Sequence, residues 1–162
     1  MRDSLHQHFT FLKSPEWEEF GRSLAPILTN DFKSSTVRHA MISEQSPNAQ
    51  SLGKGAPVTG TAIYFATDAR AWEAAWTLWS TIVPTVPGCM GVAGGWMIEP
   101  VDGHEECYIV WVGWENTEVH DAYHHTKDFR KRGIILSQAN SGYREYGHVA
   151  FRDSRSKIGA AL

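Results

Sequence analysis

The amino-acid sequence predicts an α+β fold in which two helices cover one face of a four-stranded antiparallel sheet. Three observations predict it. Four β-rich runs lie between residues 58 and 151, and the middle two are joined by a short loop. Tryptophans recur at helical spacing after the first run, and a second helical segment follows the third run. The resulting order, βαββαβ, most often folds as a ferredoxin-like plait.

The first strand and helix are indicated by residues 58–83. The run VTGTAIYFAT, residues 58–67, is typical of a strand, and Asp68 after it is a suitable helix N-cap. A helical stripe follows and ends at Pro84; its members are Trp72, Trp76, Trp79 and Val83. Such a stripe is typical of a helix packed on a sheet, and part of it is expected to line a pocket.

The second half of the predicted plait begins with a hairpin. The runs CMGVAGGWMIEP and ECYIVWVGWEN read as strands, and Asp102-Gly103 between them is a typical turn dipeptide. A helix is expected from about Thr117. In the last strand, alternation assigns side chains to two faces, with Tyr143, Glu145, Gly147, Val149 and Phe151 on one and Arg144, Tyr146, His148 and Ala150 on the other.

The chain before this unit resembles the end of the unit. Residues 4–28 and 35–42 can be aligned with the helix and last strand of the later repeat, for example His6 with His120 and His39 with His148. We therefore expect residues 1–56 to form a partial first repeat, one helix plus one strand, followed by a Ser-, Gly- and Pro-rich linker. We expect residues 57–152 to form the complete domain and residues 153–162 to form a tail.

Composition and charge exclude several classes of protein. The 15 basic and 18 acidic residues give a net charge of −3, which offers no electrostatic surface for nucleic acid. There is no apolar stretch long enough to cross a membrane and no secretion signal, so a cytoplasmic protein is expected. Cys89 and Cys107 are expected to be reduced and buried rather than catalytic.

The segment GWENTEVHDAYHHTKDF, residues 113–129, places several ionisable side chains on one helix. His120 and His124 share a face, as two metal ligands would, but no HExxH or facial-triad spacing accompanies them, and we assign no metal site. A second interpretation is a solvated helix face with weak i,i+4 pairs, which we favour for His124. The third interpretation is acid/base catalysis without a cofactor.

The acid/base interpretation depends on which groups point inward. Tyr123 continues the apolar side of the helix, so its hydroxyl is expected between helix and sheet. His148 would reach the same space if the helices cover its face of the strand, and it would act as a base there. An alternative for His148 is an ordinary core histidine bonded to a carbonyl group. Predicted substrate contacts are polar, from Arg144 and Tyr146, and apolar, from Trp76, Trp79, Trp96 and Trp111.

The order of elements and several motifs resemble the dimeric α+β barrel superfamily, which includes antibiotic biosynthesis monooxygenase domains and a plant polyketide cyclase. The residues that carry the resemblance are Trp114, Glu115, Asn116, Glu118, His120, Tyr123, Gly147, His148 and Val149. The resemblance implies a homodimer formed through the open sheet face. It also implies a catalytic tyrosine at Tyr123 and a companion histidine at His125, although the proline and second histidine of the family's HPxH-like segment are absent here.

These observations together predict a homodimeric enzyme that binds a hydrophobic small molecule, polyketide- or terpenoid-like, and uses no cofactor. The expected reaction is a cyclisation or isomerisation with Tyr123 as acid, His148 as base and His125 as a further candidate. Two alternatives stay open: a cofactor-free monooxygenase acting on an aromatic substrate, and a binding protein without catalytic activity.

Overall fold

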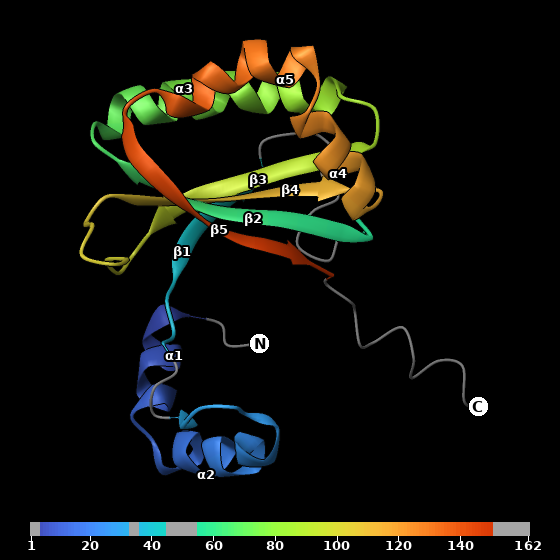
Figure 1. Ribbon diagram of the computed structural model, residues 1–162. Helices are drawn as coiled ribbons and strands as arrows, with labels where there is room; N and C mark the ends of the chain where they lie inside the picture. Colours follow the sequence, from blue (N-terminus) through green and yellow to red (C-terminus); the bar gives the residue numbers. More distant parts are fainter. Residues whose placement is uncertain (1–3, 33–35, 45–54, 151–162) are drawn as a thin grey trace. The chain divides into compact units, whose positions relative to one another are not determined.

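A computed structural model describes residues 4–32, 36–44 and 55–150 (Figure 1). Contacts divide the chain into two compact units, residues 1–37 and 38–162. The predicted tail, residues 153–162, and most of the predicted linker lie outside the described residues. Within the described part, none of the helices combines the length and the apolar character that a membrane span requires.

The smaller unit is a pair of short helices rather than the single helix expected from the sequence. Helix α1 (Leu5–Leu12) and helix α2 (Pro15–Leu24) are followed by a short 3-10 helix, η1 (Ala25–Ile27). Pro15 explains the break, because proline suits the first turn of a new helix and disrupts the interior of an existing one. Aromatic rings join the pieces, and Trp17 lies 4.6 Å from Phe32 between ring centroids.

The larger unit is built on a five-stranded antiparallel sheet. Its strands are β1 (Ala40–Glu44), β2 (Val58–Ala66), β3 (Cys89–Met97), β4 (Cys107–Trp114) and β5 (Asn140–Val149), in the order β1-β3-β4-β2-β5. Strands β2 to β5 have the order and direction of the ferredoxin-like plait that the sequence predicts. Strand β1, which the sequence analysis grouped with the N-terminal segment, extends the sheet beside β3.

The helices of the larger unit lie on one side of the sheet, as Figure 1 shows. They are α3 (Ala69–Ile82), η3 (Val83–Thr85), α4 (Thr117–His124), α5 (Lys127–Arg132) and η4 (Gly133–Ser137). Asp68 caps α3 as predicted, since its carboxylate accepts a hydrogen bond from the Ala71 amide at 2.9 Å. The predicted stripe of α3 is buried against the sheet, where Trp72 and Trp76 contact Tyr108 of β4.

Among the described residues of the larger unit, the opposite face of the sheet is apolar and only partly covered. Ile63 and Cys107 are buried there beneath Val101, which belongs to the β3–β4 connection. That connection is the tight turn expected from Asp102-Gly103: both residues have positive φ, and Val101 and His104 form a bridge. Ile109 and Trp111 alternate with inward residues of β4, so they belong to this outer face and keep part of their surface exposed.

Candidate functional site

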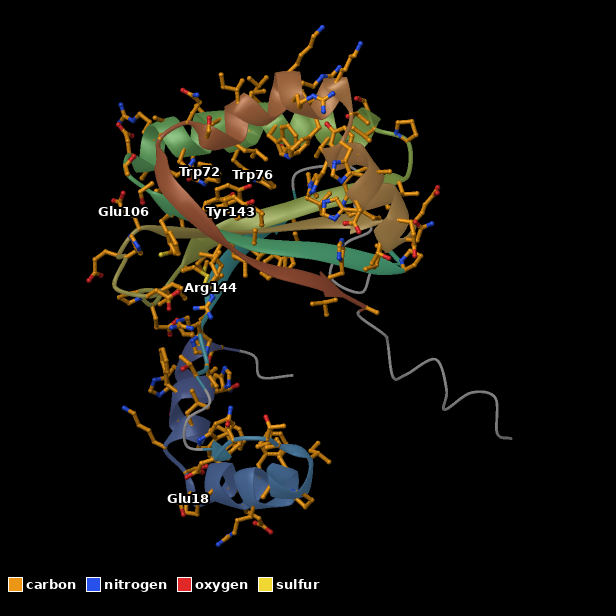
Figure 2. All side chains as sticks on the ribbon, in the orientation of Figure 1. Glu18, Trp72, Trp76, Glu106, Tyr143 and Arg144 are labelled. Carbon is orange, nitrogen blue, oxygen red and sulfur yellow. The ribbon has the colours of Figure 1, made fainter. Side chains whose placement is uncertain are left out.

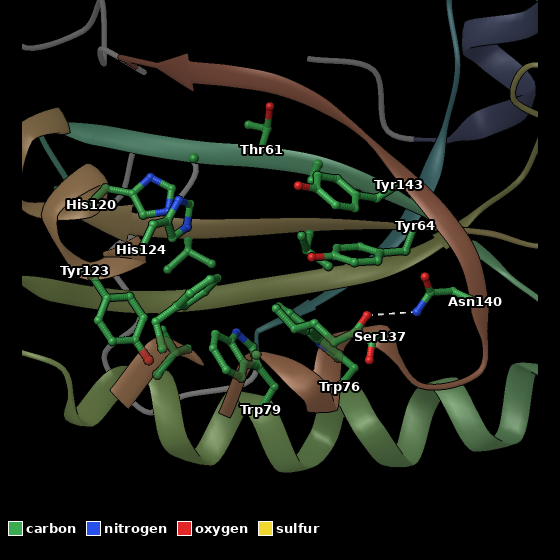
Figure 3. Close-up of a pocket in the computed structure, with 18 of the residues that line it drawn as sticks. Thr61, Tyr64, Trp76, Trp79, His120, Tyr123, His124, Ser137, Asn140 and Tyr143 are labelled. Atoms are coloured by element: carbon green, nitrogen blue, oxygen red, sulfur yellow. Dashed lines mark hydrogen bonds between the residues drawn. The ribbon is translucent and has the colours of Figure 1, made fainter. Parts of the chain in front are cut away.

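A cavity of about 740 Å³ lies between the helices and the sheet of the larger unit (Figure 3). Its size is typical of a small-molecule site. Strands β2 and β4 supply its floor, and α3, α4, α5 and η4 supply its walls. The most important lining residues are Gly60, Tyr64, Trp76, Trp79, His120 and Tyr123.

Aromatic rings form one side of the cavity. Tyr64 is stacked on Trp72 at 4.5 Å and on Tyr143 at 5.2 Å, with 28° between the ring planes in both cases. The Tyr143 side chain is 57% exposed, so this series of rings runs from solvent into the core. Flat apolar walls of this kind suit a planar, hydrophobic ligand.

His120 is held in the cavity wall by its place on helix α4 and by two neighbours of its ring. Helix α4 starts at Thr117 because the Asn116 side chain caps it, accepting a hydrogen bond from the Val119 amide at 2.8 Å. One turn later the His120 ring stacks on Trp114, with centroids 4.6 Å apart. Gly60 leaves room for the ring, because a methyl group at that position would lie only 2.9 Å from Cε1 of His120.

His120 and His148 are joined directly. Nδ1 of His120 lies 2.6 Å from Nε2 of His148, and the rings are nearly perpendicular, at 89°. One ring donates to the other, and Nε2 of His120 is the nitrogen outside this bond. The cavity is lined by His120 but not by His148, so His148 contacts the cavity through its neighbour.

The environment keeps His120 uncharged near neutral pH. Burial lowers the pKa of His120 to about 4, and the nearby His124 and His148 act in the same direction. Asp121 opposes the shift. Desolvation dominates because an imidazolium ion loses its hydration in a half-buried position.

A β-bulge in β5 brings His148 to the helix-covered side of the sheet. Thr61 of β2 pairs with Gly147 while its neighbour Ala62 pairs with Glu145, so Tyr146 is an extra residue in the strand. Gly147 has φ of 75°, as bulge residues often do. Since one inserted residue reverses the alternation, His148 lies on the same side as Tyr143 and not on the side of Arg144.

Tyr123 lies one turn after His120 and also lines the cavity. Its side chain is buried, and its hydroxyl donates a long hydrogen bond of 3.4 Å to the Asp128 carboxylate. Burial raises the pKa of Tyr123 to about 12, and the negative charge of Asp128 adds to the effect. The phenol therefore stays protonated and is available as a hydrogen-bond donor.

Two predicted site residues lie elsewhere. His125 is the C-cap of α4 and is exposed, with its backbone carbonyl accepting a hydrogen bond from Arg130. Arg144, predicted to lie beside the substrate, is not among the residues that line the cavity and forms an ion pair of 2.6 Å with Asp102. The physical reason is the bulge at Tyr146, which separates the faces of Arg144 and His148.

Of the four tryptophans predicted to contact the substrate, two line the cavity and two do not. Trp76 and Trp79 line the cavity. Trp96 instead packs against Tyr108 and donates its indole hydrogen to Glu73 at 2.7 Å, outside the cavity lining. Trp111 lies on the outer face of the sheet and is not among the residues that line the cavity. The Tyr146 side chain lies outside the described part of the chain.

Sequence reasoning did not assign His120 a role, although a signal was present. His120 precedes Tyr123 by three residues, so the two side chains share a helix face. A polar rim was also missed: Arg130, Ser137 and Asn140 line the cavity where α5 and η4 meet β5.

Within the described residues, ligating atoms of His120, Asp121 and His148 lie within 4.8 Å of one another.

The fold of this chain is shared by solved structures of low sequence identity. No protein-family model and no curated protein matches the chain. The solved structures it resembles include a candidate monooxygenase of Fusobacterium nucleatum, at 9% identity and a TM-score of 0.51, and one of Lactobacillus acidophilus, at 15% and 0.50. Both alignments cover 90% of this chain; they cover 69% of the Fusobacterium nucleatum chain and 65% of the Lactobacillus acidophilus chain.

The chain also resembles SnoaB, a cofactor-independent oxygenase of Streptomyces nogalater. Identity is 15%, the TM-score is 0.46, and the alignment covers 60% of this chain and 94% of SnoaB. The resemblances to the two candidate monooxygenases are resemblances of fold. They agree with the antiparallel sheet and one-sided helices of the larger unit.

Proposed function

We propose that this protein is an enzyme that removes a proton from a hydrophobic, planar ketone or phenol bound in the cavity, without a cofactor. The observation that carries the proposal is the imidazole of His120 in the cavity wall, bonded through its Nδ1 to His148. A neutral imidazole fixed beside an apolar binding site is the usual form of a general base.

The base works through one tautomer. When Nδ1 of His120 donates to Nε2 of His148, the lone pair on Nε2 of His120 is left to accept a proton from the ligand. After proton transfer the imidazolium keeps its bond to His148, which stabilises the positive charge. His148 is thus a positioning residue, and His120 takes the role of base that the sequence suggested for His148.

Tyr123 supplies the complementary group in this proposal. An enolate or phenolate forms when the proton leaves, and a neutral phenol on the same helix can donate a hydrogen bond to its oxygen. In the free protein that hydroxyl is occupied by Asp128 at 3.4 Å, a weak bond that a ligand oxygen can replace. The aromatic walls bind the ring system of the ligand, and its polar groups face Arg130 and Asn140.

The reaction that follows deprotonation is proposed to be a cyclisation or an isomerisation of a polyketide- or terpenoid-like molecule. The same carbanion can instead react with O₂, which would make the protein a cofactor-independent oxygenase. Both reactions begin with the step assigned to His120. We also propose a homodimer, since the outer sheet face with Trp111 and Ile109 is apolar and partly exposed.

The proposal is tested by proton exchange, which requires no knowledge of the natural substrate. An aromatic β-diketone is incubated with the protein in D₂O, and loss of its acidic C–H signal is followed by NMR. We expect the wild-type protein to accelerate exchange. The acceleration by His120→Gln should be roughly 10²–10⁴-fold smaller. His125→Gln, a change of the exposed histidine that caps the end of the same helix, is the matched control and should retain it.

The two possible outcomes after deprotonation are separated by a second assay. Extracts of the producing cells are incubated with the protein while an oxygen electrode and mass spectrometry record O₂ uptake and products. A product isomeric with its precursor supports cyclisation or isomerisation, and a gain of oxygen supports the oxygenase. A ligand that binds tightly, is recovered unchanged and shows no exchange would contradict an enzymatic role.

A further inference from the structure

The group formed by His120, His148 and Asp121 has the chemistry of a metal site. Two imidazole nitrogens and one carboxylate are borderline ligands that suit Zn²⁺ and neighbouring divalent transition metals. The two histidines come from different elements, α4 and β5, and only folding brings them together. Their ligating atoms and those of Asp121 lie within 4.8 Å of one another.

We propose that these three side chains bind one divalent cation of the Zn²⁺ class. Zinc bonds of about 2.0–2.1 Å in tetrahedral geometry place ligand atoms roughly 3.3 Å apart. The two histidine nitrogens, now 2.6 Å apart, open by roughly 0.7 Å to accept the ion. Asp121 is exposed, so its carboxylate is free to move the short distance required.

The surroundings of the two rings favour such a site. His120 is held by its stack on Trp114 and by the space above Gly60, so its direction is fixed before an ion arrives. Three protein ligands leave a coordination position for water or for a ligand oxygen. Helix α4 carries Asp121 directly beside His120, and the nearby negative charge offsets part of the charge of the ion.

Metal binding has a consequence that rests on the proposed function. Both nitrogens of the pair must present lone pairs to the ion, so the ring hydrogen of His120 moves from Nδ1 to Nε2. A protonated Nε2 cannot accept a proton from the ligand. The bound cation would therefore prevent His120 from acting as a base, and the supply of metal would regulate the reaction proposed for the cavity.

The site is tested by calorimetric titration of the EDTA-treated full-length protein with ZnCl₂. We expect one ion per chain with micromolar or tighter affinity. Asp121→Asn changes an exposed side chain and leaves the core intact. It should weaken Zn²⁺ binding by more than roughly 10-fold, which is the lower end of the loss seen when a residue that only supports a metal ligand is replaced. His148→Gln should do the same, whereas His125→Gln and His124→Gln should bind as the wild type.

Several results would overturn the site. These are no binding to the wild type, unchanged binding in an Asp121→Asn/His148→Gln double variant, or loss of binding in His124→Gln alone. Equal competition by MgCl₂ would also overturn it, because Mg²⁺ prefers oxygen ligands. No substrate is present in the titration, so its failure leaves the exchange assay of the proposed function unaffected, and failure of that assay leaves zinc binding unaffected.

Discussion

At the scale of single residues, the site depends on how burial changes ordinary side chains. His120 is a histidine on a short helix, and burial against Trp114 and over Gly60 keeps its imidazole uncharged near neutral pH. Tyr123, one turn later, is kept as a neutral donor by the same apolar surroundings. The chemistry proposed for the cavity follows from these two environments.

The role of Tyr123 is tested by replacing it with phenylalanine. Tyr123→Phe removes only the hydroxyl and the long bond to Asp128, so we expect little loss of folding free energy. Catalysed C–H exchange should fall by roughly 10²-fold, at the low end for a general acid or donor. Exchange at the wild-type rate in a folded Tyr123→Phe protein would show that the phenol has no part in the reaction.

The thiols provide a prediction about pH. Burial raises the pKa of Cys89 from 9.0 to about 11 and also raises the pKa of Cys107. Both native thiols should therefore react slowly with iodoacetamide at pH 8, and both should react readily in denaturant, as mass spectrometry would show. The pKa of Cys89 is higher in the folded protein than in the unfolded chain. The contribution of this thiol to the free energy of unfolding is therefore fully present below pH 9 and is lost as the pH rises through about 11. Rapid labelling of the native protein at pH 8 would contradict this account.

At the scale of elements, local patterns predicted most of the larger unit. The cap at Asp68, the tight turn at Asp102-Gly103 and the tryptophan stripe of α3 each depend on a few neighbouring residues, and the structure confirms them. Thr126 follows the end of α4, and its hydroxyl caps α5. The bulge in β5 was not predicted, because one extra residue leaves no clear mark in an alternating strand.

A glycine in β2 provides the test at this scale. In Gly60→Ala the new methyl group would lie 2.9 Å from Cε1 and 3.3 Å from Nδ1 of His120, so the ring must leave its present position. We expect a loss of roughly 1–3 kcal/mol in unfolding free energy and at least a tenfold slower C–H exchange. Gly133→Ala, where the methyl would meet Phe129 at an ordinary 3.7 Å, is the control for stability. Full activity in Gly60→Ala would show that the ring position is unimportant.

At the scale of the whole molecule, the sequence predicted the plait but not which face each tryptophan occupies. Both faces of β4 are apolar: Tyr108 and Val110 point to the helices, and Ile109 and Trp111 point outward. A strand with two apolar faces has no polar alternation to distinguish inside from outside. For that reason Trp111 was assigned to the ligand, whereas the structure assigns it to the outer face.

The proposed dimer is tested through that outer residue. Trp111→Glu places a charge on the open sheet face, and light scattering after gel filtration should then give the 18.1 kDa of one chain instead of twice that mass. Leu78→Glu, a change on an exposed position of α3, is the control and should remain dimeric. A monomeric wild-type protein, or a Trp111→Glu protein that stays dimeric, would contradict an interface on this face.

The central claim is that His148 fixes His120 as a neutral base with its free lone pair on Nε2. The most direct measurement is the tautomer of His120 in EDTA-treated, ¹⁵N-labelled protein, read at pH 7 from the two ring nitrogens by NMR and assigned with His120→Gln. The account predicts a hydrogen on Nδ1 and none on Nε2. A hydrogen on Nε2, or on both nitrogens, would contradict it.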